Sequence, residues 1–365
     1  MRTHVFIVNE ETFPVHLQYM FAGTGAKDKN DDPNLLADIS RVRIGDFVIF
    51  YIEGTTKVKG GFYGIFQITD DRPIVFHAPG KNGFEPCLSK KLIYRTLLKP
   101  YEVYSEGVAE CEALDKLPMY ATEIQWSLIY RKLKGKRGCT PLLPWEAQRL
   151  IDMIRDKNNG KPIATQNYRG GFAWDNANRK ITLTSSPKLY NLPRKRTIHP
   201  LPFIYKKFLD KKAYEIYLEL YFTQNAGLNN LLNPIVGDNI IWLGNEVASG
   251  VGMQKIDILT INQVEERKEY RIIELKDEPV DPKVVEQIEY YVNWASQNSG
   301  RHLEAAYNWN IRPIIVAPRH KPSNWKNVIK AFSNFNNKNI SLPILYFEFR
   351  VESPKFIDFQ RIDYK

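Results

Sequence analysis

Two carboxylates and one ammonium group occur close together in the segment from Gln254 to Trp294. Asp257 lies inside a run of strong β-formers, and Glu274 and Lys276 stand two residues apart at the end of the next such run. Because side chains alternate between the two faces of a strand, Glu274 and Lys276 share one face, and hairpin pairing brings Asp257 to it. We therefore expect two acids and a cation to converge at the edge of an apolar sheet.

These residue types indicate chemistry on a phosphodiester. Burying a carboxylate is costly unless the group is paired or bound to a metal, so two neighbouring acids favour a cation between them. Carboxylate oxygens suit Mg²⁺ or Mn²⁺, and such an ion polarises a phosphodiester and lowers the pKa of a bound water. Lys276 can orient that water or stabilise charge that develops on the phosphate.

The elements that must position these residues form an α/β pattern. We predict strands at 239–243, 255–261, 270–276 and 312–316, and helices at 206–223 and 282–295. A helix, three strands, a helix and a strand predict an α/β domain with a central mixed sheet. Asp281 and Pro282 suit the start of the second helix, where Gln287 and Tyr291 share one face.

Asp257 and Glu274-Leu275-Lys276 resemble the signature of the PD-(D/E)xK nuclease superfamily, in particular the nuclease domain of EndoMS/NucS-type endonucleases. Four further residues stand where that family has a helical Glu, a second Glu, and a helical Gln followed by Tyr: Glu215, Glu246, Gln287 and Tyr291. The resemblance covers residues 214–317. It departs from the family at Gly252, which precedes Asp257 by five residues, and at Ile256, which replaces the proline of the signature.

The resemblance implies roles for individual residues. The implied catalytic residues are Asp257, Glu274, Lys276, Gln287 and Glu215, and the implied metal ligands are Asp257, Glu274 and the carbonyl of Leu275. The implied cofactor is Mg²⁺ or Mn²⁺. Nucleases of this fold often act as dimers to cut both strands, so a homodimer is part of the expectation. A surface ion pair next to a capped helix is the alternative interpretation of the same residues.

The first hundred residues favour a small β-barrel. Short aromatic and β-branched strands are predicted at 4–8, 46–52, 61–68, 73–77 and 92–98, followed by helices at 122–133 and 144–157. This strand set resembles the PUA-like superfamily, especially EVE-type domains, at Gly45, Asp46, Tyr51 and Gly64. The resemblance implies a pocket for a single base, with Tyr51 and Trp126 as candidates for its walls. A generic small β-barrel is the alternative.

Positive charge is in excess, with 51 Lys and Arg against 41 Asp and Glu and a formal net charge of +10. Such an excess favours a polyanionic partner, here DNA. The expected phosphate contacts come from two basic runs: Arg131, Lys134, Lys136 and Arg137 in the first, and Arg194, Lys195 and Arg196 in the second.

Domain boundaries follow from a proline-rich segment. Residues 185–204 contain four prolines and a basic run, which predicts a linker between a reader domain at 1–184 and a nuclease domain at 205–365. No apolar run approaches the ~18 residues that cross a bilayer, and the first residues do not form a signal peptide, so we expect a cytoplasmic protein without membrane contact. Three widely spaced cysteines argue against a disulfide framework and a structural zinc site.

The sequence therefore predicts a hydrolase: a metal-dependent DNA endonuclease, in the form of a modification-dependent restriction enzyme with an N-terminal base reader. One alternative is a mismatch or structure-specific repair nuclease. A second alternative is a non-catalytic nucleic-acid-binding protein.

Overall fold

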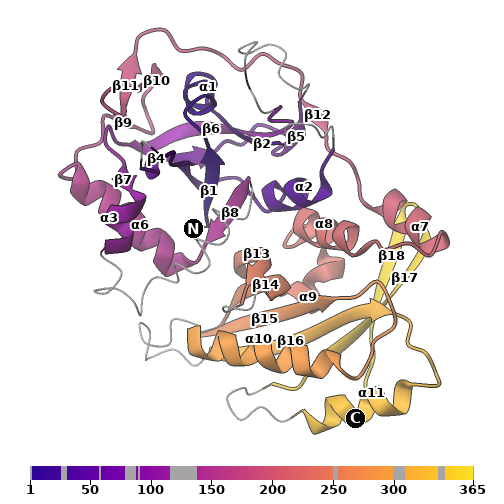
Figure 1. Cartoon of the computed structure of the whole chain (residues 1–365). Coiled ribbons are helices and arrows are strands. Elements are labelled where there is room, and N and C mark those ends of the chain that lie inside the picture. The colour runs from indigo at the N-terminus through magenta and orange to yellow at the C-terminus, as the bar shows by residue number, and fades with distance from the viewer. Residues whose placement is uncertain are drawn as a thin grey trace. The chain divides into compact units, whose positions relative to one another are not determined.

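The computed structural model describes residues 2–25, 31–56, 59–78, 88, 91–115, 138–249, 254–298, 309–335 and 342–364. The chain divides into two compact units, Met1–Thr197 and Ile198–Lys365, drawn from indigo to yellow in Figure 1. The division lies inside the 185–204 segment. Within the described part of the chain, no helix is long and apolar enough to cross a membrane.

Unit 1 is built on a mixed β-sheet with helices. The paired strands run in the order β12-β5-β6-β4-β3-β1-β8, and β2, β7 and β9 pair with members of this path. Their bounds are β1 Thr3–Val8, β2 Phe21–Thr24, β3 Phe47–Ile52, β4 Gly61–Ile68, β5 Phe76–His77, β6 Tyr94–Val103, β7 Val108–Ala109, β8 Cys139–Leu142, β9 Ala164–Thr165 and β12 Lys195–Arg196. A separate hairpin consists of β10 Gly171–Asp175 and β11 Lys180–Thr184, and the helices are α1 Phe13–Tyr19, α2 Pro33–Ile39, α3 Glu110–Asp115 and α6 Pro144–Lys157.

The predicted barrel is not closed among the residues that the structure describes. The path ends at β12 on one side and at β8 on the other. β1 pairs parallel with β3, because α1, β2 and α2 form the connection between them, and this crossover makes the sheet mixed rather than an antiparallel barrel. The predicted helix at 144–157 is α6, whose apolar stripe of Leu150, Ile151 and Ile154 packs in the core with Val5 and Ile49.

The segment 185–204, which is predicted to be a linker, contains a short strand and the start of a helix. Lys195 and Arg196 form β12, which pairs antiparallel with β5. Pro200 is the N-cap of helix α7 Leu201–Leu209, with a proline in its first turn. Proline is compatible with a helix start because the first N–H groups of a helix have no intrahelical acceptor.

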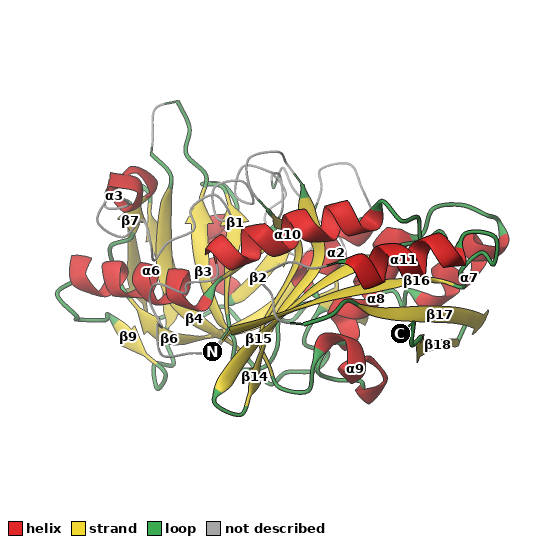
Figure 2. Ribbon diagram, turned by 90° about the horizontal axis from the view of Figure 1, so that it is seen from below, coloured by secondary structure: helices red, strands yellow, loops and turns green. Residues whose placement is uncertain are grey.

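Unit 2 has the predicted central mixed sheet. Its strands are β13 Ile240–Ala248, β14 Lys255–Val264, β15 Arg267–Leu275, β16 Trp309–Pro318, β17 Leu345–Ser353 and β18 Phe356–Arg361, in that spatial order. β15, β16 and β17 are parallel, and the other neighbours are antiparallel. Helices α7, α8 Glu215–Asn225 and α9 Asn233–Val236 and the 3₁₀ turn Asn230–Leu232 share one apolar core with the sheet. Figure 2 shows α10 Val284–Asn298 and α11 Trp325–Asn334 on the other face.

Candidate active site

Asp257 on β14 and Glu274 on β15 lie next to each other across an antiparallel strand pair. The register pairs Ile258 with Ile273, so one step further along Asp257 comes opposite Glu274. Directly opposed residues point to the same face of a sheet with Cβ atoms about 4.5–5.5 Å apart. Asp257 Oδ2 accepts a hydrogen bond from the backbone N–H of Leu275 at 2.7 Å, and Lys276 Nζ forms an ion pair with Glu274 Oε1. The fold therefore brings the acids and the lysine together, as their spacing predicts.

The carboxylate of Glu274 is in an environment that resists its ionisation. Its side chain is 1% exposed, and its Oε2 atom has no hydrogen-bond partner in the described part of the chain. Burial raises the pKa of Glu274 to about 7, although Lys276 opposes the shift. Burial, and then the charges of Glu274 and Glu215, raise the pKa of Asp257. The site is therefore short of positive charge when both acids are ionised.

The ammonium group of Lys276 supplies positive charge to the site. Burial by itself lowers the pKa of Lys276, but Glu274, Asp257 and Glu215 outweigh burial, and its pKa is raised above the ordinary value. The lysine thus stays protonated beside the two acids. Its side chain is 30% exposed, so it can also meet a ligand that approaches from solvent.

Glu215 joins the site because the predicted 206–223 helix is broken. The structure has two helices there, α7 and α8, and Glu215 is in the first turn of α8. Asp277, the residue after Lys276, accepts a hydrogen bond from the backbone N–H of Tyr214 at 2.8 Å. This bond connects the start of α8 to the end of β15. Burial raises the pKa of Glu215, and Lys276 opposes the shift.

Two other acids are held by partners of their own. Glu219 lies one turn after Glu215, is buried, and accepts a hydrogen bond from Asn245 Nδ2. Glu246 comes opposite Asp257 in the β13–β14 register, and its Oε2 atom is 2.9 Å from Lys255 Nζ. The backbone of Glu246 has φ +43°, a conformation that costs a non-glycine residue energy and is enriched at functional sites.

Helix α10 is attached to β14 next to Asp257. Gln287 Nε2 donates to Tyr291 Oη at 2.7 Å, and Tyr291 Oη donates to the carbonyl of Lys255 at 2.6 Å. Gln287 also favours the charged form of Glu274. The sequence alone does not predict the role of Asp277, whose partner Tyr214 is 63 residues away, or the link from Tyr291 to Lys255.

The donor set fits a hard divalent cation. Asp257 and Glu274 supply carboxylate oxygens, of which Oε2 of Glu274 is buried without a partner among the described residues. A cation there would offset the burial that raises both pKa values. Within the described ranges, no group of three or more His, Cys, Asp and Glu side chains is arranged to hold a metal ion.

The candidate residues of unit 1 have different surroundings. Tyr51 is completely buried in the core, lies against the tilted ring of Phe62 with ring centroids 5.0 Å apart, and donates a hydrogen bond to Glu110. Its ring therefore has no exposed face for a base. Arg194 lies 3.9 Å from Asp71, and Lys195 and Arg196 are exposed on β12. The remaining candidates lie outside the described residues: Trp126, Arg131, Lys134, Lys136 and Arg137.

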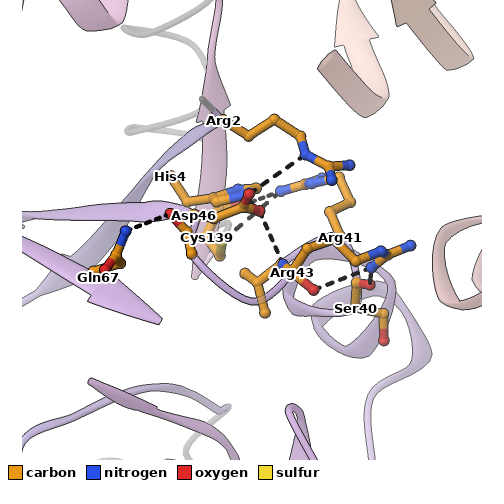
Figure 3. A network of polar contacts seen from close by, with 10 residues as sticks. Arg2, His4, Ser40, Arg41, Arg43, Asp46, Gln67 and Cys139 are labelled. Atoms are coloured by element: carbon orange, nitrogen blue, oxygen red, sulfur yellow. Dashed lines mark hydrogen bonds and ion pairs between the residues drawn. The ribbon is translucent and has the colours of Figure 1, made fainter. Parts of the chain in front are cut away.

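Asp46, one of the residues behind the EVE-type resemblance, has a structural role in unit 1. Its carboxylate makes a hydrogen bond with His4 Nε2 at 2.9 Å, accepts one from the Arg43 N–H at 2.9 Å, and lies 3.4 Å from Arg2 Nε (Figure 3). Burial lowers the pKa of His4, and Asp46 opposes the shift. These contacts join β1 to the turn that enters β3.

Comparisons with known proteins give remote similarities. No protein-family model and no curated protein matches the sequence. Human THYN1 protein, solved in complex with DNA containing 5-methylcytosine, is 11% identical, with a TM-score of 0.29 over 42% of this chain and 98% of that chain. The DUF55 domain of human thymocyte nuclear protein 1 is 11% identical, with a TM-score of 0.26 over 37% and 79%. Restriction endonuclease FokI is 13% identical, with a TM-score of 0.21 over 49% and 36%. Similarities this remote assign no function to this chain.

Proposed function

We propose that this chain is a metal-dependent DNA endonuclease whose catalytic centre lies in unit 2. The observation that carries the proposal is the pair Asp257 and Glu274, opposed across two strands, with Lys276 beside them and Glu274 Oε2 buried without a partner among the described residues. A purely structural ion pair would not need two acids that burial makes hard to ionise. A surface pair would also be exposed, whereas Glu274 is 1% exposed.

Each residue has a distinct part in the proposed reaction. Asp257 and Glu274, with the carbonyl of Leu275, would hold Mg²⁺ or Mn²⁺, which supplies polarisation of the phosphodiester and a more acidic bound water. Lys276, protonated beside Glu274, stabilises negative charge that develops on the phosphate. Gln287 favours the charged form of Glu274, and the charge of Glu215 interacts with those of Glu274 and Lys276. The bond from Asp257 to the N–H of Leu275 orients its carboxylate.

Unit 1 is proposed as the part that reads the DNA, with a modified base as the recognised feature. The support is the EVE-type strand pattern and the excess of Lys and Arg in the whole chain. To read a base in a duplex, a protein must rotate that base out of the stack. Since Tyr51 is buried, the walls of such a pocket must come from other residues.

The test is cleavage of three DNA substrates in the presence of Mg²⁺. Two are the same plasmid with and without methylation, and the third is an oligonucleotide duplex with a mismatch. The proposal predicts cleavage of the methylated plasmid and none by an Asp257→Asn variant. Cleavage of the mismatched duplex alone would favour a repair nuclease. Binding without cleavage of any substrate, with Mg²⁺ or Mn²⁺, would favour a non-catalytic protein.

A further inference from the structure

A pocket of about 500 Å³ lies in unit 2 beside the candidate active site. It lies where the parallel strands β15 and β16 end beside β17, and Pro318 on β16 pairs with Phe349 on β17 there. The lining residues used below are Phe208, Lys211, Lys212, Tyr214, Asp277, Glu278, Arg319, Phe349 and Arg350. Two of them adjoin catalytic candidates, because Asp277 follows Lys276 and Tyr214 precedes Glu215.

An aromatic ring is available to a ligand in this pocket. Tyr214 and Phe349 are each 3% exposed and belong to the core, where their rings meet edge to face. Phe208 contacts Tyr214 with ring centroids 6.4 Å apart but is itself 43% exposed. A phenyl ring that is left open at the mouth of a pocket can stack with a flat ligand.

Positive charge surrounds the same pocket. Four of its residues are cations: Lys211, Lys212, Arg319 and Arg350. Two acids also line the pocket: Asp277, which already accepts a hydrogen bond from the start of α8, and Glu278. In the described ranges, Arg319 and Arg350 form no ion pair with an acidic side chain. Lys212 lies 3.9 Å from Asp210. Cations next to an exposed ring fit a ligand that is both anionic and aromatic.

We propose that this pocket binds one nucleotide of a single DNA strand next to the scissile phosphate. Its base stacks on Phe208, and its phosphate contacts Arg319 and Arg350. Stacking on aromatic side chains together with a cationic groove is how proteins bind single strands without reading their sequence. A base that remains stacked in a duplex cannot offer its face to Phe208, so the strand must be locally unpaired here. The inference rests on the proposed nuclease function and adds an unpaired strand to its substrate.

The experiment measures binding of a fluorescein-labelled oligothymidylate of 12 nucleotides to the full chain. All proteins carry Asp257→Asn, so that cleavage does not interfere. The test variants are Phe208→Ala and the double variant Arg319→Gln with Arg350→Gln. The matched control is Arg267→Ala with Lys268→Ala, two cations at the start of β15, about 26 Å along the strand from Leu275. Affinity is measured at several salt concentrations.

We expect Phe208→Ala to weaken binding by about fivefold to 150-fold, the usual effect of removing a ring that stacks on a base. The double arginine variant should weaken binding and reduce the salt slope by about 0.7, since one single-strand phosphate contact is lost. The control variant should change neither quantity. Wild-type affinity and slope in both test variants would overturn the inference, and circular dichroism confirms that each variant is folded.

A second measurement separates this inference from the proposed function. The same pocket substitutions are placed in the chain with an intact Asp257, and Mn²⁺ binding is followed by calorimetry. Unchanged Mn²⁺ binding with weakened oligonucleotide binding supports the pocket. If the wild-type chain cleaves DNA but the pocket variants bind the oligonucleotide normally, the pocket inference alone is wrong. If the wild-type chain cleaves nothing while the pocket variants bind poorly, the nuclease proposal is wrong and the nucleotide site stands.

Discussion

At the scale of single residues, the charge state of Glu274 governs the site. Its carboxylate is buried beside Asp257 and has one cation, Lys276, as an ion-pair partner. A further positive charge would therefore favour the ionised form of both acids, which explains why the arrangement favours a bound divalent ion.

Asp257→Asn should abolish cleavage while DNA binding is retained or strengthened. The amide removes a full negative charge with little change of shape, so it weakens the metal site and reduces repulsion of phosphate. Loss of a group that acts at the transition state costs ~10²–10³-fold in rate. Asp238→Asn, on an exposed residue, is the matched control. A purified Asp257→Asn protein that cuts plasmid at the wild-type rate would disprove the assignment.

Glu274 should make the stability of the metal-free protein depend on pH. Its pKa in the folded state, about 7, lies above its unfolded value of about 4.3, so its contribution to stability is complete below about pH 4.3 and is lost as pH rises through 7. Relative to Glu274→Gln, the wild type should lose up to about 3 kcal/mol between pH 5 and pH 8. Denaturant unfolding at both pH values measures this loss.

Mg²⁺ should reverse the loss at pH 8 in the wild type, because an ion that binds only the folded state stabilises it. Glu274→Gln should respond less to Mg²⁺. The exposed Glu289→Gln on α10 is the control and should behave as the wild type. Equal pH dependence in all three proteins would show that the Glu274 carboxyl is not the titrating group.

At the scale of elements, α8 and α10 determine where Glu215 and Gln287 stand. Asp277 connects the end of β15 to the start of α8, and Tyr291 connects α10 to the start of β14. Both links are single hydrogen bonds between elements that are far apart in the sequence. The position of the site therefore depends on how these helices are attached to the sheet.

Tyr291→Phe should reduce cleavage more than Tyr290→Phe does. Both substitutions keep the ring and remove one hydroxyl that donates to a backbone carbonyl, of Lys255 and of Ser249 respectively. Each should cost about 1–3 kcal/mol of folding stability, because a polar group loses its partner. Only Tyr291 also accepts the hydrogen bond from Gln287, so only its loss frees that side chain. Equal rates in the two variants would show that the link does not position the site.

At the scale of the whole molecule, the two compact units should be separable. A fragment of residues 198–365 keeps α7, whose Leu201 and Ile204 are buried in the core of unit 2. It should unfold cooperatively in denaturant. A fragment of residues 205–365 lacks both side chains and should be less stable by several kcal/mol, since each large apolar side chain lost from a core costs about 2–5 kcal/mol. Equal stability of the two fragments, or an unfolded longer fragment, would contradict this prediction.

Much of unit 2 is predictable from the sequence because its signals are local. Alternating β-formers on two adjacent runs predict the β14–β15 hairpin, and strand periodicity then places Asp257, Glu274 and Lys276 at one edge. The 144–157 helix is likewise predictable. Its first-turn proline, its apolar face and its C-terminal cations all lie within fourteen residues. Such patterns need no knowledge of distant contacts.

Other features depend on contacts that a linear pattern does not contain. Tyr51 is of a residue type that often lines pockets. Only its contacts with Phe62 on β4 and Glu110 on α3 show that its ring is buried. The bond between Asp277 and Tyr214, across 63 residues, connects the start of α8 to the end of β15. The pocket beside Phe208 lies where the end of β16 and residues 349–351 of β17 approach α7. Periodicity determines which face a side chain takes, whereas burial and pairing depend on which distant segment packs against that face.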